Sequence, residues 1–126
     1  MKVITIKQPW ATLIAKGYKK YEFRSWNTKY RGEILIHAGA SVDKKAMDRF
    51  KHLNLEYDFS VIVAKVIITD VIKLDDISNK RISDEDEIIY GKSSRDGYAW
   101  VLTEVQPIES KTMVKGKLSI WNLDKY

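Results

Sequence analysis

Residues 61–74 are VIVAKVIITDVIKL, a long stretch dominated by valine and isoleucine. Side chains branched at Cβ keep a restricted rotamer that suits the pleated surface of a sheet, so this stretch predicts a strand. It is longer than an ordinary strand of about five or six residues. We therefore expect a bend or a β-bulge within it.

Shorter elements are expected on both sides of this stretch. Alternating or apolar runs predict strands at residues 2–7, 21–26, 33–38, 98–105 and 118–123. One helix is expected to begin with Pro9 in its first turn and to end at Gly17 in a left-handed cap. A second helix is expected from a capping Ser41 to about Leu53. Residues 77–90 remain ambiguous between loop and a short helix after Ser83.

The order of these elements indicates the fold class. Five or six strands and two or three helices that do not alternate as βαβ units predict an α+β fold of mostly antiparallel strands. Short strands rich in β-branched residues favour a small β-barrel, because closure removes exposed edges. No repeat, low-complexity tract or Pro/Gly/Ser linker divides the chain, so we expect one domain over residues 1–126.

The composition excludes several classes of protein. With 44% hydrophobic and 31% charged residues, the 126-residue chain is too apolar to be disordered. No apolar run approaches the roughly 20 residues of a membrane span, and charges interrupt the first residues too early for a signal peptide. The absence of cysteine excludes disulfides and a thiol nucleophile, and it fits a cytoplasmic setting. Without a glycine-rich phosphate loop, no cofactor is expected.

Positive charge is concentrated at the start of the chain. Residues 1–31 contain eight Lys or Arg and one acid, whereas the other 95 residues contain 14 basic and 16 acidic groups. Six aromatic residues are interleaved with these cations: Trp10, Tyr18, Tyr21, Phe23, Trp26 and Tyr30. Phosphates and stacking bases suit such a mixture, which points to a nucleic-acid partner. The alternative is a solvated basic face over a core that uses the aromatic rings.

Two motifs lie close together in this basic region. The first is Gln8-Pro9-Trp10-Ala11, and the second is Gly17-x-Lys19-x-x-Glu22-x-Arg24, followed by Trp26. Because side chains alternate along a strand, Glu22, Arg24 and Trp26 are expected to share one face.

The sequence resembles the ASCH domain family over nearly its whole length. Besides the two motifs, the resemblance rests on Arg31-Gly32, Ile34-Leu35-Ile36-His37-Ala38, Gly97-Tyr98-Ala99-Trp100 and Lys115-Gly116-Lys117 through Trp121. It implies a PUA-like β-barrel with a cleft at its mouth, which has been proposed for the family to bind RNA. The partner implied is therefore RNA or a nucleotide.

The residue types define how such a cleft would hold RNA. Arg24 offers a planar donor fork for a phosphate or a base edge, and Lys19 a point charge. Glu22 would accept from an exocyclic amine or orient Arg24; the alternative is a structural ion pair. Trp26 would stack a base or line the barrel. The complete set of expected ligand contacts is Gln8, Trp10, Lys19, Glu22, Arg24, Trp26, Arg31, Lys115 and Lys117.

Gln8 and Gly116 have more specific expected roles. Gln8 is a poor helix cap, so the first N–H groups of the helix are expected to be left for a phosphate or a base carbonyl, unless another side chain or water caps them. Gly116 permits close approach of the backbone to a ligand, although a turn before the last strand explains it equally well.

A hydrolase is the alternative function. Some small members of the wider family resemble this chain in the Gly-x-Lys element and act as amidohydrolases on N4-acetylcytidine. That resemblance implies a lysine that activates a threonine two positions before the arginine, where this chain has Glu22. A carboxylate cannot replace an alcohol that forms an acyl intermediate. Glu22 as a general base beside Lys19, or RNA cleavage with Lys19 and Arg24 stabilising charge, remains open.

The two histidines do not indicate a metal site. His37 and His52 fall on different predicted elements, and no His-x-x-x-His spacing occurs. His37 is expected to be a hydrogen-bonded strand residue rather than a ligand.

Overall fold

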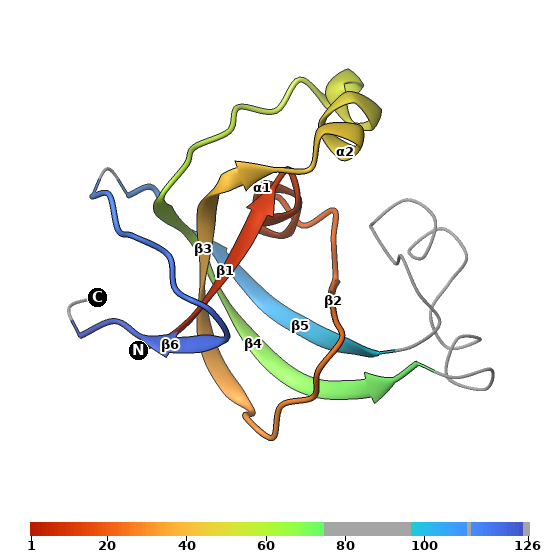
Figure 1. Cartoon of the computed structure of the whole chain (residues 1–126), viewed down its shortest axis with the longest axis vertical. Coiled ribbons are helices and arrows are strands. Elements are labelled where there is room, and N and C mark those ends of the chain that lie inside the picture. Colours follow the sequence, from red (N-terminus) through yellow and green to blue (C-terminus); the bar gives the residue numbers. More distant parts are fainter. Residues whose placement is uncertain (75–96, 111, 125–126) are drawn as a thin grey trace.

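The long valine- and isoleucine-rich stretch forms the centre of a six-stranded sheet. In the computed structural model, which describes residues 1–74, 97–110 and 112–124, the strand order is β2-β5-β4-β3-β1-β6 (Figure 1). The elements are β1 (Lys2–Gln8), α1 (Trp10–Ala15), β2 (Tyr21–Arg24), β3 (Gly32–Val42), α2 (Lys44–Arg49), the 3-10 helix η1 (Lys51–Leu53), β4 (Val61–Lys73), β5 (Tyr98–Pro107) and β6 (Ile120–Asn122). The short helix considered for residues 77–90 lies outside the described residues.

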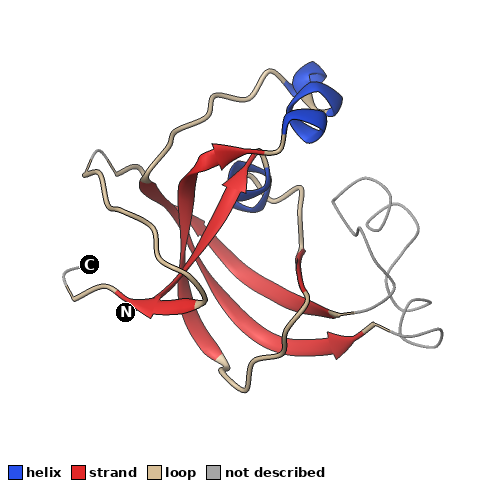
Figure 2. Ribbon diagram, viewed as in Figure 1, coloured by secondary structure: helices blue, strands red, loops and turns tan. Residues whose placement is uncertain are grey.

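The central strand β4 is bulged, as its length predicted. It pairs with β3 on one side and β5 on the other, and its register with β5 shifts between Lys65 and Ile67 and again between Ile68 and Asp70. These irregularities accompany the strong bend that the sheet shows along β4 and β5 (Figure 2).

The strand pairing confirms the predicted α+β fold of mostly antiparallel strands. β1 and β3 run parallel, and the other four pairings are antiparallel. In the part of the chain that the structure describes, β2 and β6 form the two ends of the sheet and do not pair with each other. The sheet is therefore open between its two ends. The side chain of Arg24 on β2 reaches across this opening to β1, where its Nη2 donates to the carbonyl oxygen of Thr5 at 3.0 Å.

Helix α1 packs against four strands of the sheet. It contacts β1, β3, β4 and β5, and Ala11 and Ile14 belong to the main core, together with Ile36 and Trp100. The helix ends as predicted, with Gly17 at φ +83° and the N–H of Tyr18 bonded to the carbonyl of the buried Leu13. Pro9 is the N-cap and therefore lies one residue before its predicted position in the first turn.

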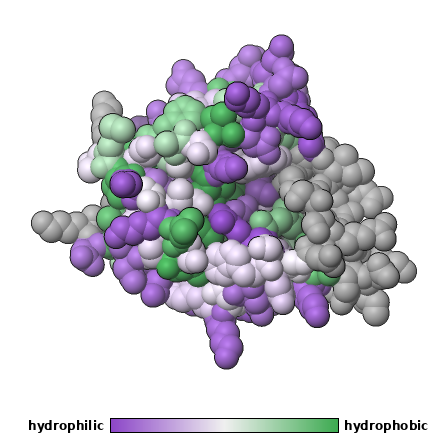
Figure 3. Space-filling model, in the orientation of Figure 1, coloured by the Kyte–Doolittle hydropathy of each residue, from purple (hydrophilic) through white to green (hydrophobic). Residues whose placement is uncertain are grey.

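The predicted helix from Ser41 to Leu53 is wrong at its start. Strand β3 continues to Val42, which pairs with Gln8 of β1, so Ser41 is a strand residue. Asp43 is the cap instead, and its Oδ1 accepts from the N–H of Ala46 at 3.1 Å. The helical region is divided into α2 and η1. Hydrophilic side chains gather at the α2 end of the molecule, at the top of Figure 3.

The bounds of three other strands differ from the predictions. β2 ends at Arg24, two residues early, and β6 is limited to residues 120–122 because Ser119 has a left-handed φ of +58°. β5 continues through the expected break to Pro107, which pairs with Ala64 at the end of the strand. Pro107 has no N–H to donate, and the hydrogen bonding to β4 resumes at the next residue, where the N–H of Ile108 donates to the carbonyl of Val63 at 2.8 Å. Within the described residues, no helix is long and apolar enough to cross a membrane.

Candidate functional site

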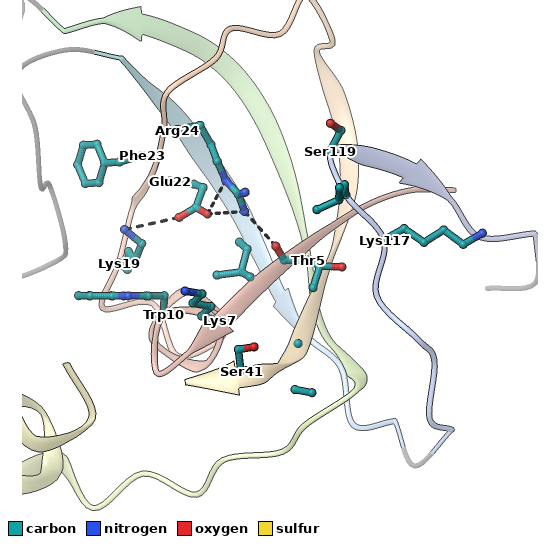
Figure 4. A pocket seen from close by; sticks show the side chains of 14 residues that line it. Thr5, Lys7, Trp10, Lys19, Glu22, Phe23, Arg24, Ser41, Lys117 and Ser119 are labelled. Carbon is teal, nitrogen blue, oxygen red and sulfur yellow. Dashed lines mark hydrogen bonds and ion pairs between the residues drawn. The ribbon is translucent and has the colours of Figure 1, made fainter. Parts of the chain in front are cut away.

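A cavity of about 440 Å³ opens between β1, β2 and the end of β3 (Figure 4). The rings of Trp10 and Phe23 form part of its wall, and Leu118, from the segment before β6, also lines it. Its polar lining comes from Thr5, Lys7, Lys19, Glu22, Arg24, Ser41, Lys117 and Ser119. Among the residues that the structure describes, four cations and one carboxylate line the cavity, which is an excess of positive charge.

Lys19, Glu22 and Arg24 form one charged cluster in the cavity. Glu22 Oε2 accepts from Arg24 Nε at 3.1 Å and forms an ion pair with Arg24 Nη2 at 3.0 Å, while Glu22 Oε1 lies 3.8 Å from Lys19 Nζ. The side chain of Lys19 is 2% exposed and that of Glu22 is 9% exposed. Figure 4 shows the three side chains pointing toward one another, with Arg24 continuing to Thr5.

The end of α1 explains why a lysine is buried here. The backbone N–H groups of both Tyr18 and Lys19 bond to the carbonyl of Leu13, at 2.9 and 3.1 Å, so the chain turns back sharply after the helix. The ammonium of Lys19 lies 5.1 Å from the ring centre of Trp10 and 4.7 Å from that of Phe23. Cation–π attraction stabilises a charge in such a place.

Strand β2 positions the other two members of the cluster. Glu22 and Arg24 are two residues apart and lie on the same face, as predicted. Opposite them on β5, Trp100 pairs with Glu22. Gly97 lies so close to Arg24 that a Cβ at Gly97 would be 2.7 Å from the Arg24 carbonyl oxygen. The glycine therefore allows the backbone that carries Arg24 to approach.

A partly buried hydrogen-bond chain supports the cavity behind Thr5. Trp121 Nε1 donates to Thr5 Oγ1 at 3.1 Å, and His37 Nε2 donates to the carbonyl of Val114 at 2.6 Å. The other ring nitrogen of His37, Nδ1, accepts from the Thr5 hydroxyl at 3.1 Å in the neutral tautomer that this donation implies. His37 is therefore a hydrogen-bonded strand residue, as expected. Burial lowers the pKa of His37, and backbone carbonyls of Val114 and Ser60 partly oppose this effect.

The cavity contains five of the residues expected to contact a ligand. Trp10, Lys19, Glu22, Arg24 and Lys117 all line it. Of these residues, Lys117 contributes least to the positive charge of the cavity. Its side chain points away from the charged cluster in Figure 4, and its Nζ lies 5.6 Å from the ring centre of Trp121.

Gln8 does not line the cavity. The prediction that the first N–H groups of α1 are left free is wrong for one of them. The fully buried side chain of Gln8 accepts from the N–H of Thr12 and donates to the carbonyl of Asp58, both at 2.9 Å. Gln8 thus satisfies one N–H group of α1 itself and attaches the helix to the loop before β4. Its partner Asp58 is 50 residues away, which local capping rules cannot predict.

The remaining three expected contacts also lie outside the cavity lining. Trp26 follows the end of β2 and packs on the core, where its ring meets that of Trp100 edge to face at 4.8 Å. Arg31 is exposed and donates to the carbonyls of Thr28 and Tyr30. Lys115 is exposed on the segment before β6.

The backbone at Gly116 lies close to side chains of the protein itself. A Cβ there would lie 2.9 Å from Thr5 Cγ2 and 3.2 Å from His37 Cε1. The glycine therefore lets the C-terminal segment lie on the hydrogen-bond chain of Thr5 and His37.

Sequence reasoning missed nine residues that line the cavity: Thr5, Ile6, Lys7, Phe23, Gly39, Ala40, Ser41, Leu118 and Ser119. Thr5 and Lys7 are next to the first motif and carry no signal of their own, because their position depends on where β1 lies in the sheet. Leu118 is 93% exposed, and nothing in its sequence position indicates that this apolar side chain lines the cavity. Among the described residues, no group of three His, Asp or Glu side chains is placed to hold a metal ion.

These features define a small α+β domain with a basic cavity at the open side of a curved sheet. A sequence model of the ASCH domain family matches residues 4–112. The chain belongs to the ASCH domain family, and its fold is PUA-like.

Relatives with known names agree with this assignment. Activating signal cointegrator 1 from Homo sapiens and from Mus musculus are each 26% identical over 131 residues, which cover 96% of this chain. The chain spans 22% of the length of these relatives.

Solved structures show the same fold at low identity. The crystal structure of ASCH from Zymomonas mobilis superposes with a TM-score of 0.61 at 16% identity, covering 98% of this chain and 87% of that chain. A single-residue variant of the same protein gives 0.59 at 15% identity, covering 98% and 90%.

Proposed function

We propose that this domain binds RNA, or one nucleotide of it, in the cavity between β1 and β2. The observation that carries the proposal is the charged cluster of Lys19, Glu22 and Arg24, which lies in a cavity of about 440 Å³ beside the rings of Trp10 and Phe23. The volume falls in the range of about 300–1,000 Å³ that small-molecule sites occupy. Aromatic rings and cations in one hollow suit a base and its phosphate.

Lys7 is the residue best placed to attract the phosphates. It is exposed, lines the cavity and forms no ion pair that would fix it to the protein, as far as the structure describes the chain. Phosphate contacts from such lysines add affinity without base preference and make binding sensitive to salt.

Fluorescence anisotropy with a labelled single-stranded RNA octamer tests the proposal. We expect affinity to fall steeply with salt, and Lys7→Ala to reduce the slope of log affinity against log salt by about 0.7, the value for one phosphate of a single strand. Lys16→Ala is the matched control, because Lys16 is an exposed lysine that does not line the cavity. Absence of binding at low salt, or equal effects of the two substitutions, would refute the proposal.

The same cavity favours one second candidate, a hydrolase that acts on an acylated cytidine or an RNA linkage. The specific observation is that Lys19 and Glu22, the two groups such an enzyme would use, lie 3.8 Å apart and line the cavity. Purified protein would be incubated with N4-acetylcytidine and with labelled RNA. Turnover that Glu22→Gln abolishes would establish the hydrolase, and intact substrates at high protein concentration would eliminate it.

A further inference from the structure

The two carboxylate oxygens of Glu22 have unequal surroundings. Oε2 accepts from Arg24 Nε at 3.1 Å and is 3.0 Å from Arg24 Nη2. For Oε1, the contact within the described residues is the 3.8 Å ion pair with Lys19, which is longer than a hydrogen bond. A carboxylate has about four acceptor sites, so Oε1 retains acceptor capacity at the cavity wall.

A buried acceptor gains most from a donor that arrives with the ligand. The side chain of Glu22 is 9% exposed and lines the cavity, so a ligand that fills the cavity takes the remaining water away from this carboxylate. Leaving such an oxygen without a donor costs free energy, and a ligand N–H that meets it recovers this cost.

The charges around Oε1 restrict the kind of donor. A phosphate offers acceptor oxygens and a negative charge, which the carboxylate of Glu22 would repel at close range. A cationic amine would meet Lys7, Lys19 and Arg24 in the same cavity. A neutral N–H group on a flat ring avoids both conflicts and packs against the rings of Trp10 and Phe23. The exocyclic amino group of a nucleobase has this chemistry, and carboxylates accept from it in base recognition.

We propose that Glu22 Oε1 accepts a hydrogen bond from the exocyclic amino group of one unpaired nucleobase, while the phosphates of that strand stay near Lys7 at the edge of the cavity. This inference rests on the proposed function and specifies which part of the nucleotide enters the cavity. Pairing in an RNA duplex uses one N–H of the amino group, and the deep, narrow major groove keeps side chains away from the other, so the site takes single strands.

The test changes the ligand and leaves the protein unaltered. Anisotropy is measured with octamers of cytidine and of adenosine, and with octamers in which every base carries two methyl groups on the amino nitrogen. N4,N4-Dimethylcytidine and N6,N6-dimethyladenosine have no amino N–H, whereas the monomethyl forms retain one and are the matched steric controls. For the tighter of the two octamers, we expect binding to weaken roughly 5- to 150-fold on dimethylation and by less than about threefold on monomethylation.

The outcomes separate this inference from the proposed function. Tight binding of both the unmodified and the dimethylated octamers would overturn the role of Glu22 and leave RNA binding intact. Equal binding of a fully paired RNA duplex and of its single strand at the same salt concentration would also overturn it. If neither octamer binds at low salt, the proposed function itself fails.

Discussion

The charged cluster makes a sharp prediction about stability. Glu22→Gln keeps the size and one oxygen of the side chain but removes the negative charge between Lys19 and Arg24. We expect the free energy of unfolding to fall by about 3 kcal/mol, because removing one partner of a buried ion pair costs about 3–5 kcal/mol. The value lies at the lower end because the side chain of Arg24 is 25% exposed and solvent can stabilise its charge.

A second substitution tests the physical cause. Lys19→Met in the Glu22→Gln background removes the buried ammonium and places a flexible thioether beside the rings of Trp10 and Phe23, where sulfur packs well. We expect the double variant to regain about 2 kcal/mol of the loss, which a double-mutant cycle would measure as coupling between the two positions.

Urea unfolding followed by tryptophan fluorescence measures these changes. At a slope of about 1.5 kcal/mol per molar urea, Glu22→Gln should lower the midpoint by about 2 M. Glu33→Gln is the matched control, since Glu33 pairs with Lys65 at 3.4 Å but is 53% exposed, and such pairs contribute at most about 1 kcal/mol. If Glu22→Gln loses no more than Glu33→Gln, or the double variant is less stable than Glu22→Gln alone, the cluster is not held together by charge in the way argued.

Three further predictions concern residues around the cavity. Burial lowers the pKa of His37 below 6.5 in the folded protein. As pH falls, His37 is therefore protonated in the unfolded state before it is protonated in the folded state. The free energy of unfolding should therefore decrease from about pH 6.5 down to the lowered pKa, and His37→Gln should flatten this dependence in urea titrations at pH 5–7. Leu118→Ser should leave the unfolding midpoint unchanged, because Leu118 is 93% exposed, but weaken RNA-octamer binding about fivefold in anisotropy; an unchanged affinity would remove Leu118 from the site. Gly97→Ala should cost more than about 2 kcal/mol, because its Cβ would be 2.7 Å from the Arg24 carbonyl at φ +107°. Gly17→Ala, at φ +83° with open space around it, should cost only about 1 kcal/mol, and similar losses for the two glycines in thermal unfolding would contradict this reasoning.

Strand patterns were predictable from the sequence because side chains alternate locally, whereas the strand ends depend on pairing partners. The apolar run of β3 ends at Ala38, yet the strand continues because Val42 pairs with Gln8 of β1. This continuation moves the helix cap from Ser41 to Asp43. In the same way, the end of β2 at Arg24 removes Trp26 from the alternation that predicted a shared face.

Part of the candidate site was visible in the sequence for a similar reason. Glu22 and Arg24 are neighbours on one strand face, and Lys19 follows the helix end at Gly17, so local rules place all three. Thr5 and Phe23 were not predictable. Thr5 enters because β1 lies across the sheet opening from β2, and Phe23 because the cavity wraps around the edge of that strand.

Arg24 connects the stability of the sheet to the occupancy of the cavity. Its guanidinium holds Glu22 and also donates to Thr5 O, across the opening where β2 and β1 have no backbone pairing in the described chain. If stability were the whole purpose, well-packed apolar residues would often serve as well as a buried ion cluster. The cluster instead leaves Glu22 Oε1 with acceptor capacity at the cavity wall. A ligand that donates to this oxygen would strengthen the cluster that joins the two strands, so binding should raise the free energy of unfolding by the amount that mass action requires.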